Sequence, residues 1–147
     1  MTRPLATAAA LLFTAGCFTQ RTPADAQLIA QWRFAPPRDW VPSRTNEWES
    51  ANSHGLLSLQ VLPAKRPLRA IIDPYFTEYA SVKLCRGTPA LLGKWRPPFG
   101  FTISDEIAMQ QPGSIAIATY LYPRRFSADP AAETALRSLC PRERPAS

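Results

Sequence analysis

The chain has 147 residues, of which 46% are hydrophobic and 19% are charged. That balance is typical of a globular protein and excludes a largely disordered chain. The net charge is +6, but the basic residues are scattered and form no recognition-helix motif, so we expect no nucleic-acid binding.

The first 26 residues are predicted to be a targeting segment. Arg3 precedes an uncharged apolar run from Leu5 to Phe18, and Ala24-Asp25-Ala26 fits the small-residue rule for signal peptidase. The run is shorter than the roughly 18 to 20 residues that a membrane-spanning helix needs. We therefore expect an exported protein that is periplasmic, secreted or lipid-anchored, with no transmembrane helix in the mature chain.

A second processing signal overlaps the first. Thr14-Ala15-Gly16-Cys17 resembles a bacterial lipobox, whose cysteine becomes a lipid-bearing N-terminus, although Thr14 stands where leucine is usual. Cleavage after Ala26 would release a soluble protein, whereas lipidation of Cys17 would tether the domain to the membrane. The sequence leaves both open, and a single domain over residues 27–147 is expected in either case.

The cysteines predict one disulfide. Cys17 lies in the targeting segment, which leaves Cys85 and Cys140 as a pair in an oxidising compartment. In the chain-entropy model a bond between them stabilises the fold by about 4 kcal/mol. The chain has no C-x-x-C motif and one histidine, His54, so we expect neither a metal site nor a cofactor.

Alternating apolar residues and turn signals predict two β-hairpins. In the first, residues 46–52 and 56–62 flank Ser53-His54-Gly55. In the second, residues 101–109 and 114–122 flank a turn over residues 110–113 and should pair antiparallel.

The segments between the hairpins are less regular. Prolines interrupt residues 63–74, which we expect to be a loop, and residues 75–80 resemble a helical turn. Residues 81–85 alternate like a strand. Thr88-Pro89 is typical of a helix start, so a short helix is expected before Arg96.

The last predicted element is a helix that begins at its N-cap, Asp129, and ends at Pro141. Its apolar stripe should lie on the sheet, and the disulfide at Cys140 would clip its last turn to the sheet region. We therefore expect one small α+β domain, in which helices cover a twisted antiparallel sheet.

This order of parts resembles small exported α/β domains of the PsbP-like type. The resemblance rests on the aromatic opening from Trp32 to Trp40, the strand from Leu57 to Leu62, and the strand from Gly113 to Tyr122 that leads to the last helix. It implies an antiparallel sheet covered by helices and a role as an accessory or assembly factor. It carries over no functional residues.

No catalytic motif is recognised. His54 lies in a predicted turn without the partner that a serine nucleophile needs. Asp105 and Glu106 are neighbours, so on a strand they point to opposite faces and cannot act on one substrate. We expect a non-catalytic binding or scaffolding module of the cell envelope, with a small extracytoplasmic hydrolase as the alternative.

The candidate ligand-binding residues are Tyr120, Tyr122, Arg124 and Arg125. Aromatic rings beside guanidinium groups can hold a sugar, an aromatic group or an acidic ligand. The alternative is that the two tyrosines cover the sheet beneath the last helix. The expected partner is an envelope protein or an anionic surface.

Overall fold

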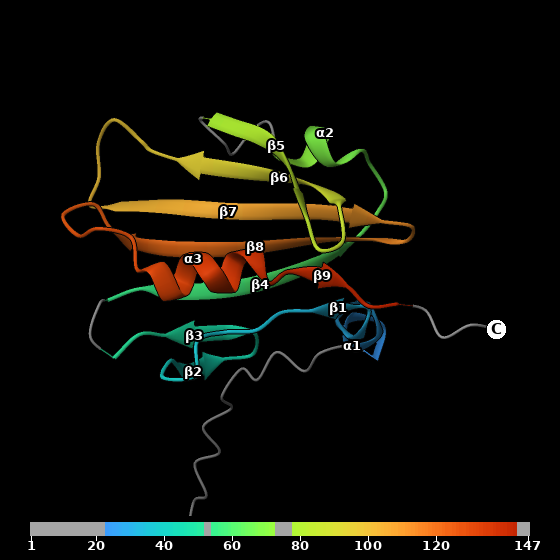
Figure 1. Cartoon of the computed structure of the whole chain (residues 1–147), viewed down its shortest axis with the longest axis horizontal. Helices are drawn as coiled ribbons and strands as arrows, with labels where there is room; N and C mark the ends of the chain where they lie inside the picture. Colours follow the sequence, from blue (N-terminus) through green and yellow to red (C-terminus); the bar gives the residue numbers. More distant parts are fainter. Residues whose placement is uncertain (1–22, 52–53, 73–77, 144–147) are drawn as a thin grey trace, which may run out of the picture.

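The computed structural model describes residues 23–51, 54–72 and 78–143, which form nine strands and three short helices (Figure 1). The fold is therefore mainly β. The expected α+β domain with a sheet covered by helices is wrong, because the helices have only eight, five and eight residues and strands account for about half of the described residues.

Seven strands form one antiparallel sheet in the order β2-β3-β4-β8-β7-β6-β5. Their bounds are Val41–Arg44 (β2), Glu47–Glu49 (β3), Leu56–Pro63 (β4), Glu78–Leu84 (β5), Thr88–Trp95 (β6), Thr102–Gln111 (β7) and Ser114–Pro123 (β8). The long strands β7 and β8 lie in the interior of the sheet, so each of them is paired with a strand on both sides. Two further strands, β1 (Trp32–Arg33) and β9 (Cys140–Pro141), pair with each other.

Both predicted hairpins are present. β3 pairs antiparallel with β4, and β7 pairs antiparallel with β8 along the full length of both strands. In the β7–β8 turn Gly113 has the positive φ of 93° that favours glycine. Before β4, His54 has a positive φ of 54°.

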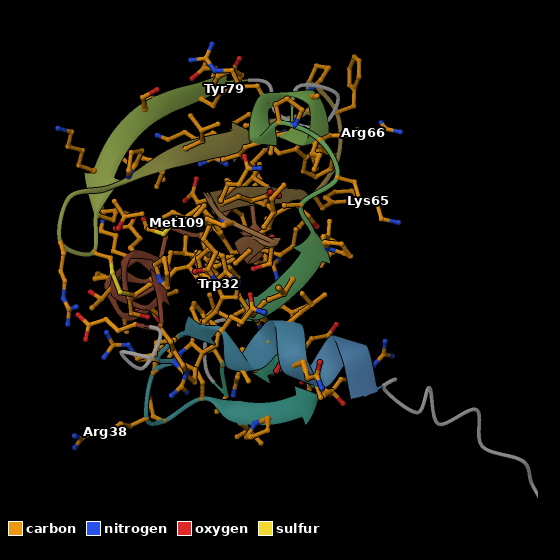
Figure 2. All side chains as sticks on the ribbon, turned by 90° about the vertical axis from the view of Figure 1, so that its right-hand side faces the viewer. Trp32, Arg38, Lys65, Arg66, Tyr79 and Met109 are labelled. Carbon is orange, nitrogen blue, oxygen red and sulfur yellow. A yellow bond between two sulfur atoms is a disulfide. The ribbon has the colours of Figure 1, made fainter. Side chains whose placement is uncertain are left out.

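The two faces of the sheet are covered unequally. One face packs beneath α3 (Pro130–Arg137) and carries the larger core cluster, which includes Leu57, Ile107 and Leu136. The opposite face packs beneath α2 (Leu68–Ile72) and has a smaller cluster around Ile72. Figure 2 shows α2 and α3 on opposite sides of the sheet. The second face is thus covered by a helix of five residues and has room for a cavity.

The C-terminal helix begins as predicted and ends early. The side chain of Asp129 accepts a hydrogen bond from the backbone N–H of Ala131 at 2.9 Å, which satisfies a donor of the first turn. The helix ends at Arg137, so the prediction that it continues through Cys140 is wrong. Cys140 lies in β9 and is bonded to Cys85 in the β5–β6 turn, with 5.4 Å between the two Cα atoms. The predicted disulfide is confirmed, but it joins β9 to the turn and not a helix to the sheet.

Three local predictions between the hairpins need correction. The helix expected after Thr88 is strand β6, because β5 and β7 pair with it on both sides and this pairing overrides the local capping signal. The loop expected over residues 63–74 contains α2. Of the helical turn expected over residues 75–80, residues 78–80 belong to β5, and residues 75–77 lie outside the described residues.

The N-terminal helix α1 (Pro23–Ala30) contains the predicted cleavage point after Ala26. Ala26 and Gln27 are exposed, whereas Leu28 and Ile29 are half-buried. Both half-buried residues therefore follow that cleavage point. Residues 1–22, Cys17 included, lie outside the described residues. Within the described part of the chain, no helix has the length and apolar character to cross a membrane.

Candidate functional site

Two of the four predicted site residues belong to the core. Tyr120 is 1% exposed and Tyr122 is 5% exposed, both on the face covered by α3. Their rings stack with 4.5 Å between centroids, and Trp40 packs against Tyr120 edge-on. The Tyr120 hydroxyl accepts a hydrogen bond from the backbone N–H of Asp129 at 3.0 Å. Both rings therefore pack under the helix, and neither is open to a ligand.

A buried polar network surrounds Tyr122. The guanidinium of Arg96 donates to Asp105 Oδ1 at 2.5 Å and to the Ser104 carbonyl at 2.5 Å. The Tyr122 hydroxyl donates to Asp105 Oδ2 at 3.1 Å. Burial, followed by the Asp105 charge, raises the pKa of Tyr122 to about 12. At neutral pH the hydroxyl is protonated, so the network holds β7, β8 and the segment after β6 together.

Asp105, Glu106 and His54 have separate surroundings in the described part of the chain. Asp105 points into the α3 face, whereas Glu106 points to the opposite face, as strand alternation predicts. His54 stacks on Phe126 with 6.1 Å between ring centroids. Among residues 23–51, 54–72 and 78–143 there is no group of three or more His, Cys, Asp or Glu that could hold a metal ion.

The exposed part of the predicted site has different aromatic neighbours. Arg124 and Arg125 lie at the surface beside the β6–β7 loop, where Phe99 is 88% exposed and Phe101 is 92% exposed. Large aromatic rings are normally buried, because their apolar area is costly to leave in water. Two exposed phenylalanine rings on one short loop depart from this rule and indicate a candidate binding surface.

Hydrogen bonds join the two loops that carry these side chains. The backbone N–H of Arg124 donates to the Phe101 carbonyl at 2.7 Å, and the Arg124 guanidinium donates to the Pro97 carbonyl. The Arg125 guanidinium lies 4.9 Å from the centroid of the Phe126 ring. A cleft of about 530 Å³ opens here between Phe101 and the two arginines. We call Phe99, Phe101, Arg124, Arg125 and Phe126 the Phe–Arg patch.

The patch offers apolar area and fixed positive charge. This combination can bind an apolar or anionic surface, and it contains no acid or base placed for proton transfer. The two arginines were predicted from the sequence, whereas Phe99 and Phe101 were not. For Phe99 a signal was present, since an aromatic residue inside a loop rich in proline and glycine has no strand or helix face on which to be buried. Phe101 was predicted as the first residue of the strand 101–109 and carried no such signal.

The patch and α1 lie at opposite ends of the β7–β8 hairpin (Figure 1). The Ser114 hydroxyl at the hairpin turn donates to the side-chain oxygen of Gln31 at 3.0 Å. The patch follows the other end of the hairpin, next to Thr102 and Pro123. Strands of this length separate the two ends by about 30 Å, at roughly 3.3 Å per residue.

Comparison with models of known protein families and with curated proteins finds no match for this chain. Neither comparison bears on the PsbP-like resemblance. Any function for the chain therefore rests on the chemistry of its own residues.

Proposed function

We propose that the protein is an exported, non-catalytic binding module of the cell envelope that docks on an anionic membrane surface through the Phe–Arg patch. The observation that carries this proposal is the near-complete exposure of Phe99 and Phe101 beside two arginines. Aromatic rings favour the boundary between headgroups and acyl chains, and arginines are attracted to anionic headgroups.

The expected affinity is modest. Burying one phenyl ring contributes about 2 kcal/mol, and one arginine near an anionic surface contributes about 1 kcal/mol. Two of each give roughly 6 kcal/mol, which corresponds to a binding constant on the order of 10⁴ M⁻¹. Such an affinity gives reversible binding, comparable to that of a single acyl chain. The patch would therefore position the domain on a membrane but not fix it there permanently.

Vesicle co-sedimentation tests the proposal. The protein without residues 1–26 is mixed with vesicles of phosphatidylcholine, either pure or with a third of the lipid replaced by phosphatidylglycerol. We expect binding to the anionic vesicles, weaker binding at high salt, and at least a tenfold loss of affinity in the Phe99→Ser/Phe101→Ser and Arg124→Gln/Arg125→Gln variants.

Matched controls exist elsewhere on the surface. Lys65→Gln/Arg66→Gln removes the same charge from the loop before α2, and Val41→Ser removes an exposed apolar side chain from β2. These controls should leave binding unchanged within about twofold, and melting temperatures should show that all variants fold. Equal binding by the patch variants and the wild type, or no binding to either vesicle, contradicts the proposal.

A further inference from the structure

A cavity of about 390 Å³ lies on the face of the sheet opposite α3. Small-molecule sites in proteins typically measure roughly 300 to 1,000 Å³, so the cavity is of a size for a small ligand. α2 forms one wall through Ile71 and Ile72, and Leu62 of β4 and Ile117 of β8 contribute further apolar surface. Figure 2 shows α2 on this side of the sheet.

The polar groups of the cavity come from neighbouring strands in register. Glu106 of β7 lies directly opposite Thr119 of β8, and both line the cavity with Gln60 of β4. On its other side Glu106 faces Gly93 of β6, which places no side chain beside the carboxylate. The carboxylate, a hydroxyl and an amide therefore converge on a space whose other lining residues, among those that the structure describes, are apolar.

The cavity has one charged lining residue among those described, Glu106. Its carboxylate accepts a hydrogen bond from the Ser104 hydroxyl at 3.2 Å. Burial raises the pKa of Glu106, and the Ser104 hydrogen bond only partly opposes this. The ionised carboxylate is therefore incompletely solvated, and a cation placed in the cavity would stabilise it.

Two of the described charged residues near the cavity, Arg69 and Glu47, contact other side chains. The Arg69 guanidinium on α2 lies 5.7 Å from the centroid of the Tyr79 ring of β5. On β3, Glu47 lies in the same cross-strand row as Thr119 and Glu106, and its carboxylate pairs with Arg44 at 4.0 Å. Neither Arg69 nor Arg44 lines the cavity. The charge of Glu106 is thus open to neutralisation by a ligand.

We propose that this cavity binds a small amphipathic amine, whose ammonium group pairs with Glu106 and Thr119 and whose hydrocarbon chain lies against α2. The preference follows from the arrangement of a negative group beside apolar walls. The negative charge of Glu106 also distinguishes this site from the Phe–Arg patch, which is positive and lies on loops at one end of the sheet. The two sites therefore select ligands of opposite charge.

Three probes with the same chain length test the proposal: n-octylamine, n-octanol and octanoate. Each is titrated into the ¹⁵N-labelled protein, and amide chemical shifts report both the affinity and the location. We expect octylamine to bind at least tenfold more tightly than octanoate, because the half-buried Glu106 carboxylate attracts an ammonium group and repels a second carboxylate. The shifts should map to β4, α2, β7 and β8. This comparison uses the wild-type protein and does not depend on any variant folding.

Variants then assign the selectivity to the carboxylate. Glu106→Gln keeps the shape of the side chain, so it should weaken octylamine binding at least tenfold and leave octanol binding within about twofold. Glu49→Gln removes a carboxylate from β3 outside the cavity and serves as the matched control. The proposal is overturned if octanoate binds as tightly as octylamine, if Glu106→Gln leaves octylamine binding unchanged, if the shifts map elsewhere, or if no probe binds.

Discussion

At the residue scale, the hydrogen bonds of Asp105 show how the fold accommodates a buried carboxylate. Its two carboxylate oxygens accept from different donors, the Arg96 guanidinium and the Tyr122 hydroxyl. A buried charge is costly unless it is paired and hydrogen-bonded, and here both conditions are met. The arrangement also explains why Tyr122 is in the core although it carries a polar group. Its hydroxyl is needed as a donor, not as a ligand contact.

Replacing Tyr122 by phenylalanine should reduce the loss of stability at alkaline pH. The folded-state pKa of Tyr122 is raised from 10.0 to about 12. The folded protein therefore keeps a proton that the unfolded chain releases. The stability that this proton contributes is fully present below pH 10 and is lost as the pH rises through about 12.

Urea unfolding at pH 7 and pH 11 measures this effect. At pH 7 Tyr122→Phe should lower the free energy of unfolding by about 1 kcal/mol, the value of one hydrogen bond. At pH 11 the difference between variant and wild type should become smaller, because only the wild type has begun to lose the contribution of its phenol. A difference that is equal at both pH values would contradict the assignment.

At the scale of elements, the sequence was most informative where a local signal and the tertiary structure agree. The Pro112-Gly113 turn and the alternating residues around it predicted β7 and β8, and Asp129-Pro130 predicted the start of α3. Thr88-Pro89 shows the opposite case, since pairing with β5 and β7 overrides a helix-start signal. The end of α3 was missed because residues beyond Arg137 pair with β1, a contact distant in sequence.

The candidate site was predicted in part for a related reason. Arg124 and Arg125 follow a recognisable strand, but the phenylalanines next to them come from another loop. The pairing of Thr102 with Pro123 and the hydrogen bonds of Arg124 to Phe101 and Pro97 bring the two loops together. The Glu106 cavity also depends on an element that was not predicted. α2 forms one of its walls, but the prolines and basic residues of this segment predicted a loop.

The Cys85–Cys140 bond connects elements that hydrogen bonds alone hold weakly. It ties the turn at the edge of the sheet to β9, which has two residues and pairs only with β1. In that turn Cys85, Arg86 and Gly87 have positive φ angles of 37°, 59° and 80°. For the two non-glycine residues this conformation is unfavourable. The bond therefore acts together with the Arg86–Glu143 ion pair, which joins the same turn to the residues that follow β9.

Removal of this disulfide should destabilise the protein strongly. We expect Cys85→Ala/Cys140→Ala to lower the free energy of unfolding by about 4 kcal/mol, because the unfolded chain regains the entropy of an open loop. Urea titration measures the change. Thiol labelling of the denatured, unreduced wild type should find both cysteines blocked, whereas two labelled thiols would show that the bond is absent from the purified protein.

At the scale of the whole molecule, the sheet separates three surfaces with different chemistry. α3 and the β1–β9 pair cover one face, the Glu106 cavity opens on the other, and the Phe–Arg patch occupies one end. α1 lies at the opposite end, about 30 Å from the patch at the rise of a β-strand. A lipid on Cys17 would add a second weak membrane signal to that of the patch, and two such signals together give stable attachment.

Intact-mass analysis of the protein from an envelope fraction should find a chain without residues 1–16 or without residues 1–26. The first product would carry a lipid-sized addition on Cys17, and the second would begin at Gln27. Cleavage after Ala26 should leave the fold intact, because the half-buried Leu28 and Ile29 of α1 remain. The Phe99→Ser/Phe101→Ser variant separates the two cases in cells. A lipidated protein would keep its membrane association through Cys17, whereas a protein that begins at Gln27 would be released. Retention of Met1 in the envelope protein would contradict both routes and the prediction of export.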